Sequence, residues 1–221
     1  GLIFRSTKDG IAVSDPIGDS WLLVNTTDGG DSWHDLVKDK RPASLKSEAA
    51  FAASNGSLAY SDDGFIWLGT GGATGQPHAS LLIGNINSSK WSRIDTPLVT
   101  GESSGIFAVD FSQHPRGIIV GGDYKKEDSP ESAAAYSNDG GRTWTLSNKQ
   151  PSGFRSSVAF TKPAGKLGIY ITVGPNGTDT STDGDTWNRA SDIGFHAIRT
   201  SPSGHLWAVG SGGRVGRFEW K

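Results

Sequence analysis

A short signature recurs along this chain and restricts its fold more than any other feature. Three copies place Ser or Thr, Asp, Gly and Trp at similar spacing, at 26–33, 137–144 and 181–187. A degenerate copy at 85–91 keeps the Trp but lacks the Asp-Gly pair. Successive intervals are 58, 53 and 43 residues when counted between the four motif tryptophans, Trp33, Trp91, Trp144 and Trp187. An element that returns about every 50 residues between strand-like segments predicts a β-propeller.

Each copy predicts a hairpin corner that carries its own hydrogen bonds. The Asp is suited to accept bonds from backbone N–H groups just ahead of it. The Gly supplies a positive φ, and the Trp can bury its ring against a neighbouring unit. The Asp28–Asp31 run resembles a calcium loop, but no copy has the alternating carboxylates and distal Glu that calcium requires, so we expect no metal site. We therefore assign a structural role to the corner residues, which are Asp28, Gly30, Trp33, Asp139, Gly141, Trp144, Asp183, Gly184 and Trp187.

Alternating apolar residues and turn signals divide the chain into antiparallel four-stranded units. We expect an all-β fold with no helix of consequence and with one domain over 1–221. The second unit is expected to begin with a strand at 50–52, and the fifth contains only three strand-like segments. The blades are expected at about 2–36, 49–94, 105–147, 156–190 and 195–220.

Two interpretations of the blade number follow. One is a compact five-bladed ring. The other, which we favour, is five blades from the C-terminal part of a larger propeller, because no spare strand precedes the first blade to complete the unfinished fifth. Open sheet edges promote aggregation. Missing N-terminal blades, or a homodimer formed through the open edge, would cover them.

The corner motif resembles the Asp-box, or bacterial neuraminidase (BNR) repeat, of the sialidase-like superfamily. The chain is most similar to photosystem-assembly-factor-like propellers, many of which carry only a general oxidoreductase label. The segments that support this are 51–54, 69–73, 121–126 and 194–197. The resemblance covers nearly the whole chain and implies a propeller. Asp-boxes serve as structural corners in enzymes and receptors alike, so they say little about function.

The composition of the chain limits the classes of binding partner and the compartment that we expect. The chain has 21 basic and 23 acidic residues and no basic stripe, which argues against nucleic acid as a partner. No apolar run approaches the length of a membrane span. Cysteine is absent, which excludes disulfides and thiol chemistry. Half of the eight asparagines lie in Asn-x-Ser/Thr sequons, which favours a secreted glycoprotein with candidate sites at Asn25, Asn55, Asn87 and Asn176.

Propeller topology predicts where a ligand would bind. The corners lie on one face, and the loops between second and third strands and between blades lie on the opposite face, where propellers usually bind ligands. Each candidate has a structural alternative: a loop cap, a local ion pair, a solvated loop or a channel residue. The predicted ligand-binding residues are Glu48, Thr70, Asp123, Tyr124, Lys125, Arg155 and His196.

These residues are consistent with three functions that have unequal support. The preferred one is a non-catalytic binding or assembly propeller that recognises a protein segment or a glycan, because the mixed charges fit these better than a polyanion. The alternative is a sialidase-like or endo-glucanase-like glycoside hydrolase, which needs two carboxylates. Glu48 and Asp123 are the only carboxylate pair that we expect on the channel face, and the Arg-Ile-Pro segment of sialidases is absent. An oxidoreductase has the least support, because the chain shows no dinucleotide fingerprint, thiol pair or metal-ligand cluster, and no cofactor is expected.

Overall fold

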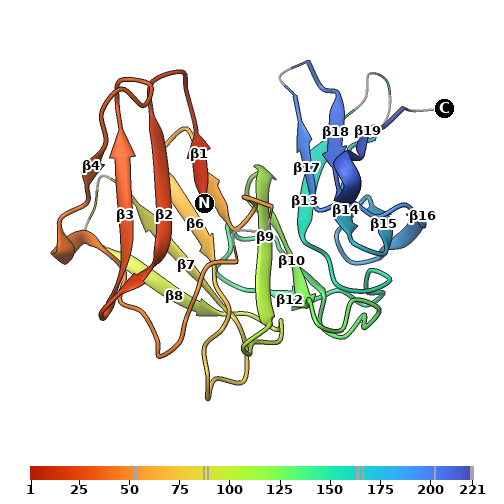
Figure 1. Ribbon diagram of the computed structural model, residues 1–221, viewed down its shortest axis with the longest axis horizontal. Helices are drawn as coiled ribbons and strands as arrows, with labels where there is room; N and C mark the ends of the chain where they lie inside the picture. Colours follow the sequence, from red (N-terminus) through yellow and green to blue (C-terminus); the bar gives the residue numbers. More distant parts are fainter. Residues whose placement is uncertain are drawn as a thin grey trace.

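The computed structural model describes residues 1–51, 54–86, 88, 90–162, 165, 167–201 and 203–219. The described strands form five antiparallel sheets, four with four strands and one with three. Figure 1 shows these sheets arranged as blades around a common hub. Apart from strands, the described part contains two short 3₁₀ turns, η1 (Lys38–Lys40) and η2 (Ser211–Gly213). The predicted all-β propeller is confirmed.

The blades follow one another in chain order. Blade 1 contains β1 (Leu2–Phe4), β2 (Gly10–Ile17), β3 (Ser20–Thr26) and β4 (His34–Asp35). Blade 2 contains β5 (Leu58–Tyr60), β6 (Phe65–Gly69), β7 (Ser80–Asn85) and β8 (Trp91–Asp95). Blade 3 contains β9 (Ser104–Gln113), β10 (Arg116–Asp123), β11 (Ala134–Ser137) and β12 (Thr145–Leu146). Blade 4 contains β13 (Ser157–Thr161), β14 (Ile169–Gly174), β15 (Gly177–Ser181) and β16 (Asn188–Ser191). Blade 5 contains β17 (Ala197–Thr200), β18 (Leu206–Val209) and β19 (Val215–Arg217).

The expected first strand of blade 2 was wrong. The strand that pairs with β6 is β5, in which Ala59 lies opposite Trp67. Ala50 and Phe51 belong to no strand, and Ala52 lies outside the described residues. The Ala50 N–H instead donates to Asp15 Oδ1 at 2.9 Å. That bond ties the link between blades 1 and 2 back to blade 1, and the inner strand of blade 2 begins at Leu58.

The core lies between adjacent blades, because successive side chains of a strand point to opposite faces of its sheet. In blade 2, Ile66 and Leu68 pack with residues of blade 1, whereas Trp67 packs with residues of blade 3. In blade 3, Ile118 faces blade 4 and Ile119 faces blade 2. Both faces of a middle blade are therefore apolar, which explains its continuous apolar strands.

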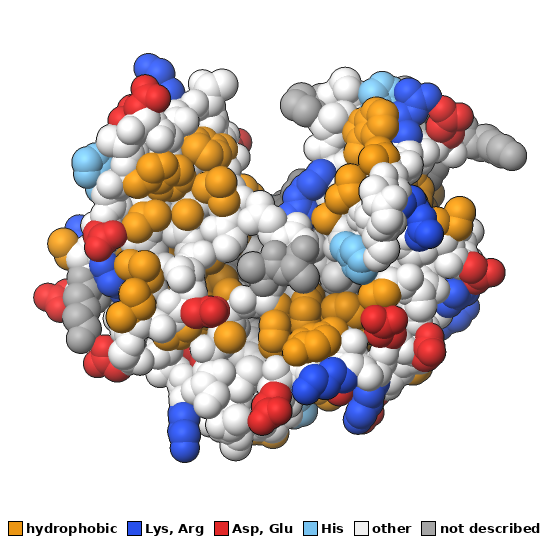
Figure 2. Space-filling view, in the orientation of Figure 1, with side chains coloured by type: hydrophobic (Ala, Val, Ile, Leu, Met, Phe, Trp, Pro, Cys, Tyr) orange, Lys and Arg blue, Asp and Glu red, His pale blue; other side chains and the backbone are white. Residues whose placement is uncertain are grey.

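The inner strands contact one another in the order β1, β5, β9, β13 and β17 and enclose the hub. Between blade 1 and blade 5 the ring is open, and Figure 2 shows a notch with hydrophobic side chains on both walls. Arg199 spans the notch at the hub, where its Nη2 donates to Ser54 O at 3.1 Å and Asn55 O at 2.6 Å. The outer faces of the two end blades carry exposed apolar side chains, namely Leu2 and Phe4 on blade 1 and Trp207, Val209 and Val215 on blade 5.

Within the described part of the chain, no helix is long and apolar enough to cross a membrane.

Candidate functional site

Strand direction gives the propeller two different faces. The hairpins between first and second strands and the corner loops between third and fourth strands lie on one side, here called the corner face. The loops between second and third strands and the links between blades lie on the other side, here called the link face. These sides follow from the antiparallel order within each sheet.

The corner loops are closed by the hydrogen bonds of their own polar residues. In the blade 3 corner, Asp139 Oδ1 accepts from Thr143 N at 2.9 Å and from Ser137 Oγ at 2.8 Å. The Ser137 hydroxyl in turn accepts from Gly141 N at 2.9 Å. The Thr143 bonds hold the pKa of Asp139 down, at about 2. The corners of blades 1 and 4 have the same bonding around Asp28 and Asp183, so the carboxylates stabilise turns.

An aromatic cup lies on the link face, where blades 2, 3 and 4 meet. Phe51 stacks on Phe107 with ring centroids 4.3 Å apart. The Tyr124 ring stands nearly perpendicular to both of these rings, and Phe154 meets Phe107 edge to face at 4.6 Å. The cup has a volume of about 340 Å³ and is completed by Glu127, Ser156, Pro175 and His196. In Figure 2, hydrophobic side chains gather low in the centre of the view and are bordered by charged side chains.

Two of the predicted binding residues line this cup. Tyr124 is 42% exposed, and its backbone N–H donates to Ser103 O at 3.1 Å, which fixes the loop after β10 beside the link before β9. His196 follows the link from blade 4, and its Nε2 lies 2.8 Å from Ser211 Oγ. The cup therefore joins one residue from a second-to-third-strand loop with one from a blade link, as the propeller topology predicts.

Glu48 and Thr70 lie in the interior between blades 1 and 2. The Glu48 carboxylate accepts from Arg93 Nη1 at 2.5 Å, Thr70 Oγ1 at 2.8 Å, Leu45 N at 2.9 Å and Trp21 Nε1 at 3.2 Å. Burial acts to raise the pKa of Glu48, but these hydrogen bonds outweigh it and the pKa lies below its usual range. This carboxylate is permanently charged at neutral pH, and its acceptor capacity is used within the fold.

Arg155 is fully buried below the cup. It forms an ion pair with Asp179, and its Nη1 donates to Asn176 Oδ1 at 2.8 Å and to Phe154 O at 2.7 Å. Burial lowers the pKa of Arg155 against the opposing effect of Asp179. The guanidinium thus holds the backbone of one aromatic residue of the cup in place.

Of the two remaining predicted residues, Asp123 ends β10 and Lys125 lies in the loop that follows. Asp123 Oδ1 accepts from Lys125 N at 2.9 Å, and its other oxygen lies 4.0 Å from Lys126 Nζ. The side chain of Lys125 is exposed. These residues shape the loop that carries Tyr124, and they do not line the cup.

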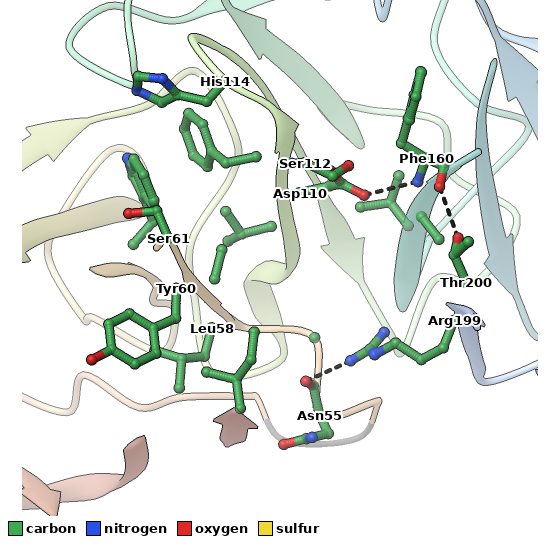
Figure 3. A pocket seen from close by; sticks show the side chains of 18 of the residues that line it. Asn55, Leu58, Tyr60, Ser61, Asp110, Ser112, His114, Phe160, Arg199 and Thr200 are labelled. Atoms are coloured by element: carbon green, nitrogen blue, oxygen red, sulfur yellow. Dashed lines mark hydrogen bonds between the residues drawn. The ribbon is translucent and has the colours of Figure 1, made fainter. Parts of the chain in front are cut away.

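A second cavity, of about 480 Å³, lies at the hub and opens on the corner face. All five inner strands contribute to its walls, and Figure 3 shows its polar side chains. Asp110 accepts from Ser112 and from Phe160 N at 2.9 Å, and Arg199 turns away toward the carbonyl of Asn55. Burial raises the pKa of Asp110, against the opposing bonds from Ser112 and Phe160 and the charge of Arg199.

The side-chain amides of the sequon asparagines form different hydrogen bonds. Asn55 Oδ1 accepts from Leu2 N at 2.6 Å, and its Nδ2 donates to Leu2 O at 2.7 Å. Asn176 Nδ2 donates to Glu127 O and Asp128 Oδ1. A glycan on either nitrogen would replace these bonds. Asn25 lies on β3, Asn87 lies outside the described residues, and glycosylation stays a prediction.

Sequence reasoning did not identify Phe51, Phe107, Phe154 or Glu127 as cup residues. The repeat carried no signal for Phe154. It lies three residues before β13, whereas Phe195 lies two residues before β17 and packs in the core between blades 4 and 5. The contribution of Phe107 depends on how blades 2 and 3 pack, which strand pattern does not specify.

Comparison with known proteins identifies the fold. No family model and no curated protein matches the chain. Among solved structures, it is similar to YCF48 bound to D1 peptide, with a TM-score of 0.57, 18% identity and coverage of 99% of this chain and 62% of that one. It is also similar to PorZ of the type IX secretion system of Porphyromonas gingivalis, with a TM-score of 0.55, 11% identity and coverage of 98% and 39%. A third is the GH74 xyloglucanase of Xanthomonas campestris, with a TM-score of 0.54, 14% identity and coverage of 96% and 36%.

The chain is a β-propeller. At these identities the likeness extends to the fold and no further, and these propellers include enzymes as well as non-enzymes. The chain spans less than two thirds of the length of each of the three. The function must therefore be argued from the site.

Proposed function

We propose that this protein is a non-catalytic binding propeller that captures a protein segment at the aromatic cup on its link face. The observation that carries the proposal is the cup itself, in which four aromatic rings surround a space of about 340 Å³. Such a volume lies at the lower end of the range for ligand pockets, about 300–1,000 Å³, and aromatic rings provide large contact areas at low conformational cost.

A peptide is the preferred ligand because the cup offers mainly apolar contact with a few polar groups on its rim, as peptide anchor pockets do. The similar protein YCF48 was solved with a peptide bound. Hydrolysis of a glycosidic bond needs two carboxyl groups beside the substrate. Among the described residues that line the cup, Glu127 is the one carboxylate, so the cup favours binding over hydrolysis.

The test is a selection of random dodecapeptides on the wild-type protein, followed by affinity measurement with Tyr124→Ala. We expect selected peptides to contain aromatic or large aliphatic residues, and Tyr124→Ala to weaken their binding by about 2 kcal/mol, roughly thirtyfold in Kd. Leu146→Ala is the matched control, because Leu146 is 39% exposed on the outermost strand of the same blade and should leave affinity unchanged.

Peptides that bind Tyr124→Ala as tightly as wild type would contradict the proposal. So would a selection that yields no peptide while an oligosaccharide array gives a hit that Tyr124→Ala abolishes, because the cup would then be a glycan site.

A further inference from the structure

Glu127 places a carboxylate on the rim of the cup with its backbone firmly held. The Glu127 carbonyl accepts from Phe154 N at 2.9 Å and from Asn176 Nδ2 at 2.9 Å. Phe154 is itself an aromatic wall of the cup. These two hydrogen bonds fix the Glu127 backbone relative to the aromatic rings. The side chain of Glu127 is exposed to solvent.

The Glu127 carboxylate forms no ion pair among the described residues. The adjacent Lys126 lies 4.0 Å from Asp123, and the adjacent Asp128 accepts from Asn176 Nδ2 at 2.6 Å. The loop over 123–131 contains four acidic and two basic residues. Glu102 is also exposed and acidic. It precedes Ser103, whose carbonyl accepts the hydrogen bond from Tyr124 N.

Asn176 holds this acidic loop against the cup. The buried Arg155 determines the orientation of the Asn176 side-chain amide. Its Oδ1 accepts from the buried Arg155, so its Nδ2 is directed at Glu127 O and Asp128 Oδ1. An amide with its oxygen on a guanidinium and its nitrogen on two oxygens cannot be reversed without losing these bonds. Asn176 is thus a positioning residue that transmits the geometry of the Arg155–Asp179 pair to the rim.

We infer that the protein segment bound at the cup carries a lysine or arginine beside its apolar anchor residue, and that Glu127, held by Asn176, pairs with it. The inference rests on the proposed function and names the chemistry of its partner. Lys126 lies near Asp123, Arg214 Nη1 binds Gly194 O and His196 lies beside Ser211. Lys125 is exposed, and no ion pair joins it or any other described residue to Glu127, which leaves the Glu127 carboxylate for the ligand.

The test uses three capped peptide pools, Ac-X-Z-Φ-Z-X-NH₂, in which Φ is Trp, Phe or Leu and Z is Lys, Gln or Glu. We expect wild type to bind the Lys pool about three- to fivefold more tightly than the Gln pool at low salt, the size of an exposed ion pair. The Glu pool should bind most weakly. High salt should reduce the difference between the Lys and Gln pools, because a rim charge acts through screened electrostatics.

Glu127→Gln should abolish the difference in affinity between the Lys and Gln pools. Glu131→Gln, in the same exposed loop, is the matched control and should retain the preference. Asn176→Asp keeps the shape of the side chain but loses both donated bonds. It should speed amide hydrogen exchange across 124–131 in the absence of peptide and weaken binding of the Lys pool.

Equal affinity of wild type for the Lys and Gln pools, or an undiminished Lys preference in Glu127→Gln, would overturn the inference. Unchanged exchange across 124–131 in Asn176→Asp would overturn the positioning role of Asn176. Failure of the proposed function looks different: either no pool binds, or Tyr124→Ala binds all three pools as tightly as wild type.

Discussion

At the scale of single residues, the corner loops show why one short motif recurs. Each Asp closes its own loop, and the corners of blades 3 and 4 also bond to the preceding blade. The Trp67 indole of blade 2 donates to Gly140 O in the blade 3 corner at 2.9 Å, and Ser147 Oγ of blade 3 donates to Gly184 O in the blade 4 corner at 2.7 Å. These two corners therefore stabilise both their own turns and their junctions with the preceding blade.

Asp139→Ala should lower the free energy of unfolding by about 1 kcal/mol at pH 7, because the lost bonds face solvent and are screened. The folded-state pKa of Asp139, about 2, lies below the unfolded value of about 3.9. Its stabilisation is present above pH 4 and is lost as the pH falls toward 2.

Urea unfolding at pH 7 and pH 3 measures this. The difference in stability between wild type and Asp139→Ala should be smaller at pH 3 than at pH 7. Asp31→Asn, an exposed acid in the blade 1 corner, serves as the control. A difference that is the same at both pH values would show that the Asp139 carboxylate does not stabilise its loop through its charge.

The motif tryptophans should contribute unequally to the free energy of unfolding, although the motifs around them are alike. Trp187 is 1% exposed in the core between blades 3 and 4, whereas Trp33 is 37% exposed on the open side of blade 1. Trp187→Ala should cost roughly 3–5 kcal/mol through cavity formation, and Trp33→Ala roughly 1 kcal/mol. Equal losses in thermal unfolding would mean that the Trp33 ring is covered in solution.

At the scale of elements, the link between blades 1 and 2 is held by one buried acid. Glu48 on the link binds Arg93 on β8, Thr70 after β6 and Trp21 on β3. A buried carboxylate with so many donors orders a segment that has little strand structure of its own. These bonds anchor the part of the link around Glu48 to strands of both blades.

Glu48→Ala should lower the free energy of unfolding by about 3–5 kcal/mol, because Arg93 and three further donors lose their acceptor. Asp123→Ala should change stability by less than about 0.5 kcal/mol, as an exposed loop residue does. Chemical denaturation of both variants gives the comparison. A stable Glu48→Ala protein with impaired peptide binding would instead restore Glu48 as a ligand-binding residue.

At the scale of the whole molecule, the open notch is the dominant surface feature. In blades 2 to 5, one face of the sheet packs against the preceding blade. Blade 1 carries Leu2 and Phe4 on the equivalent face. In blades 1 to 4, the opposite face packs against the following blade. Blade 5 carries Trp207 and Val209 on this face. Exposed apolar faces of this kind promote association.

We therefore expect the 221-residue chain to self-associate in a concentration-dependent manner in sedimentation velocity. The double substitution Trp207→Lys and Val209→Lys should shift it toward monomer, because it places charges on one wall of the notch. Leu167→Lys alters an exposed apolar residue outside these faces and should have no such effect. A wild-type monomer at high concentration would contradict the expectation.

The fold was predictable because it repeats. Corner motifs at intervals of about 50 residues and strands with apolar residues on both faces are local properties of the sequence. The candidate site was predictable only in part. Tyr124 and His196 could be placed on the correct face because loop order determines the face of a propeller. The role of Arg155 could not be assigned, because its partner Asp179 lies on β15, 24 residues away.

The sequence by itself determined the blade architecture, the corner bonding and the face on which a ligand would meet the loops, because each depends on residues close together in the chain. Only the tertiary structure decided which loop residues meet. It stacked Phe51 on Phe107, buried Glu48 and Arg155 with partners from other strands, and placed Glu127 on the rim of the cup. Those outcomes depend on how neighbouring blades pack, and packing between blades is set by side-chain volumes and distant hydrogen bonds that no local pattern encodes.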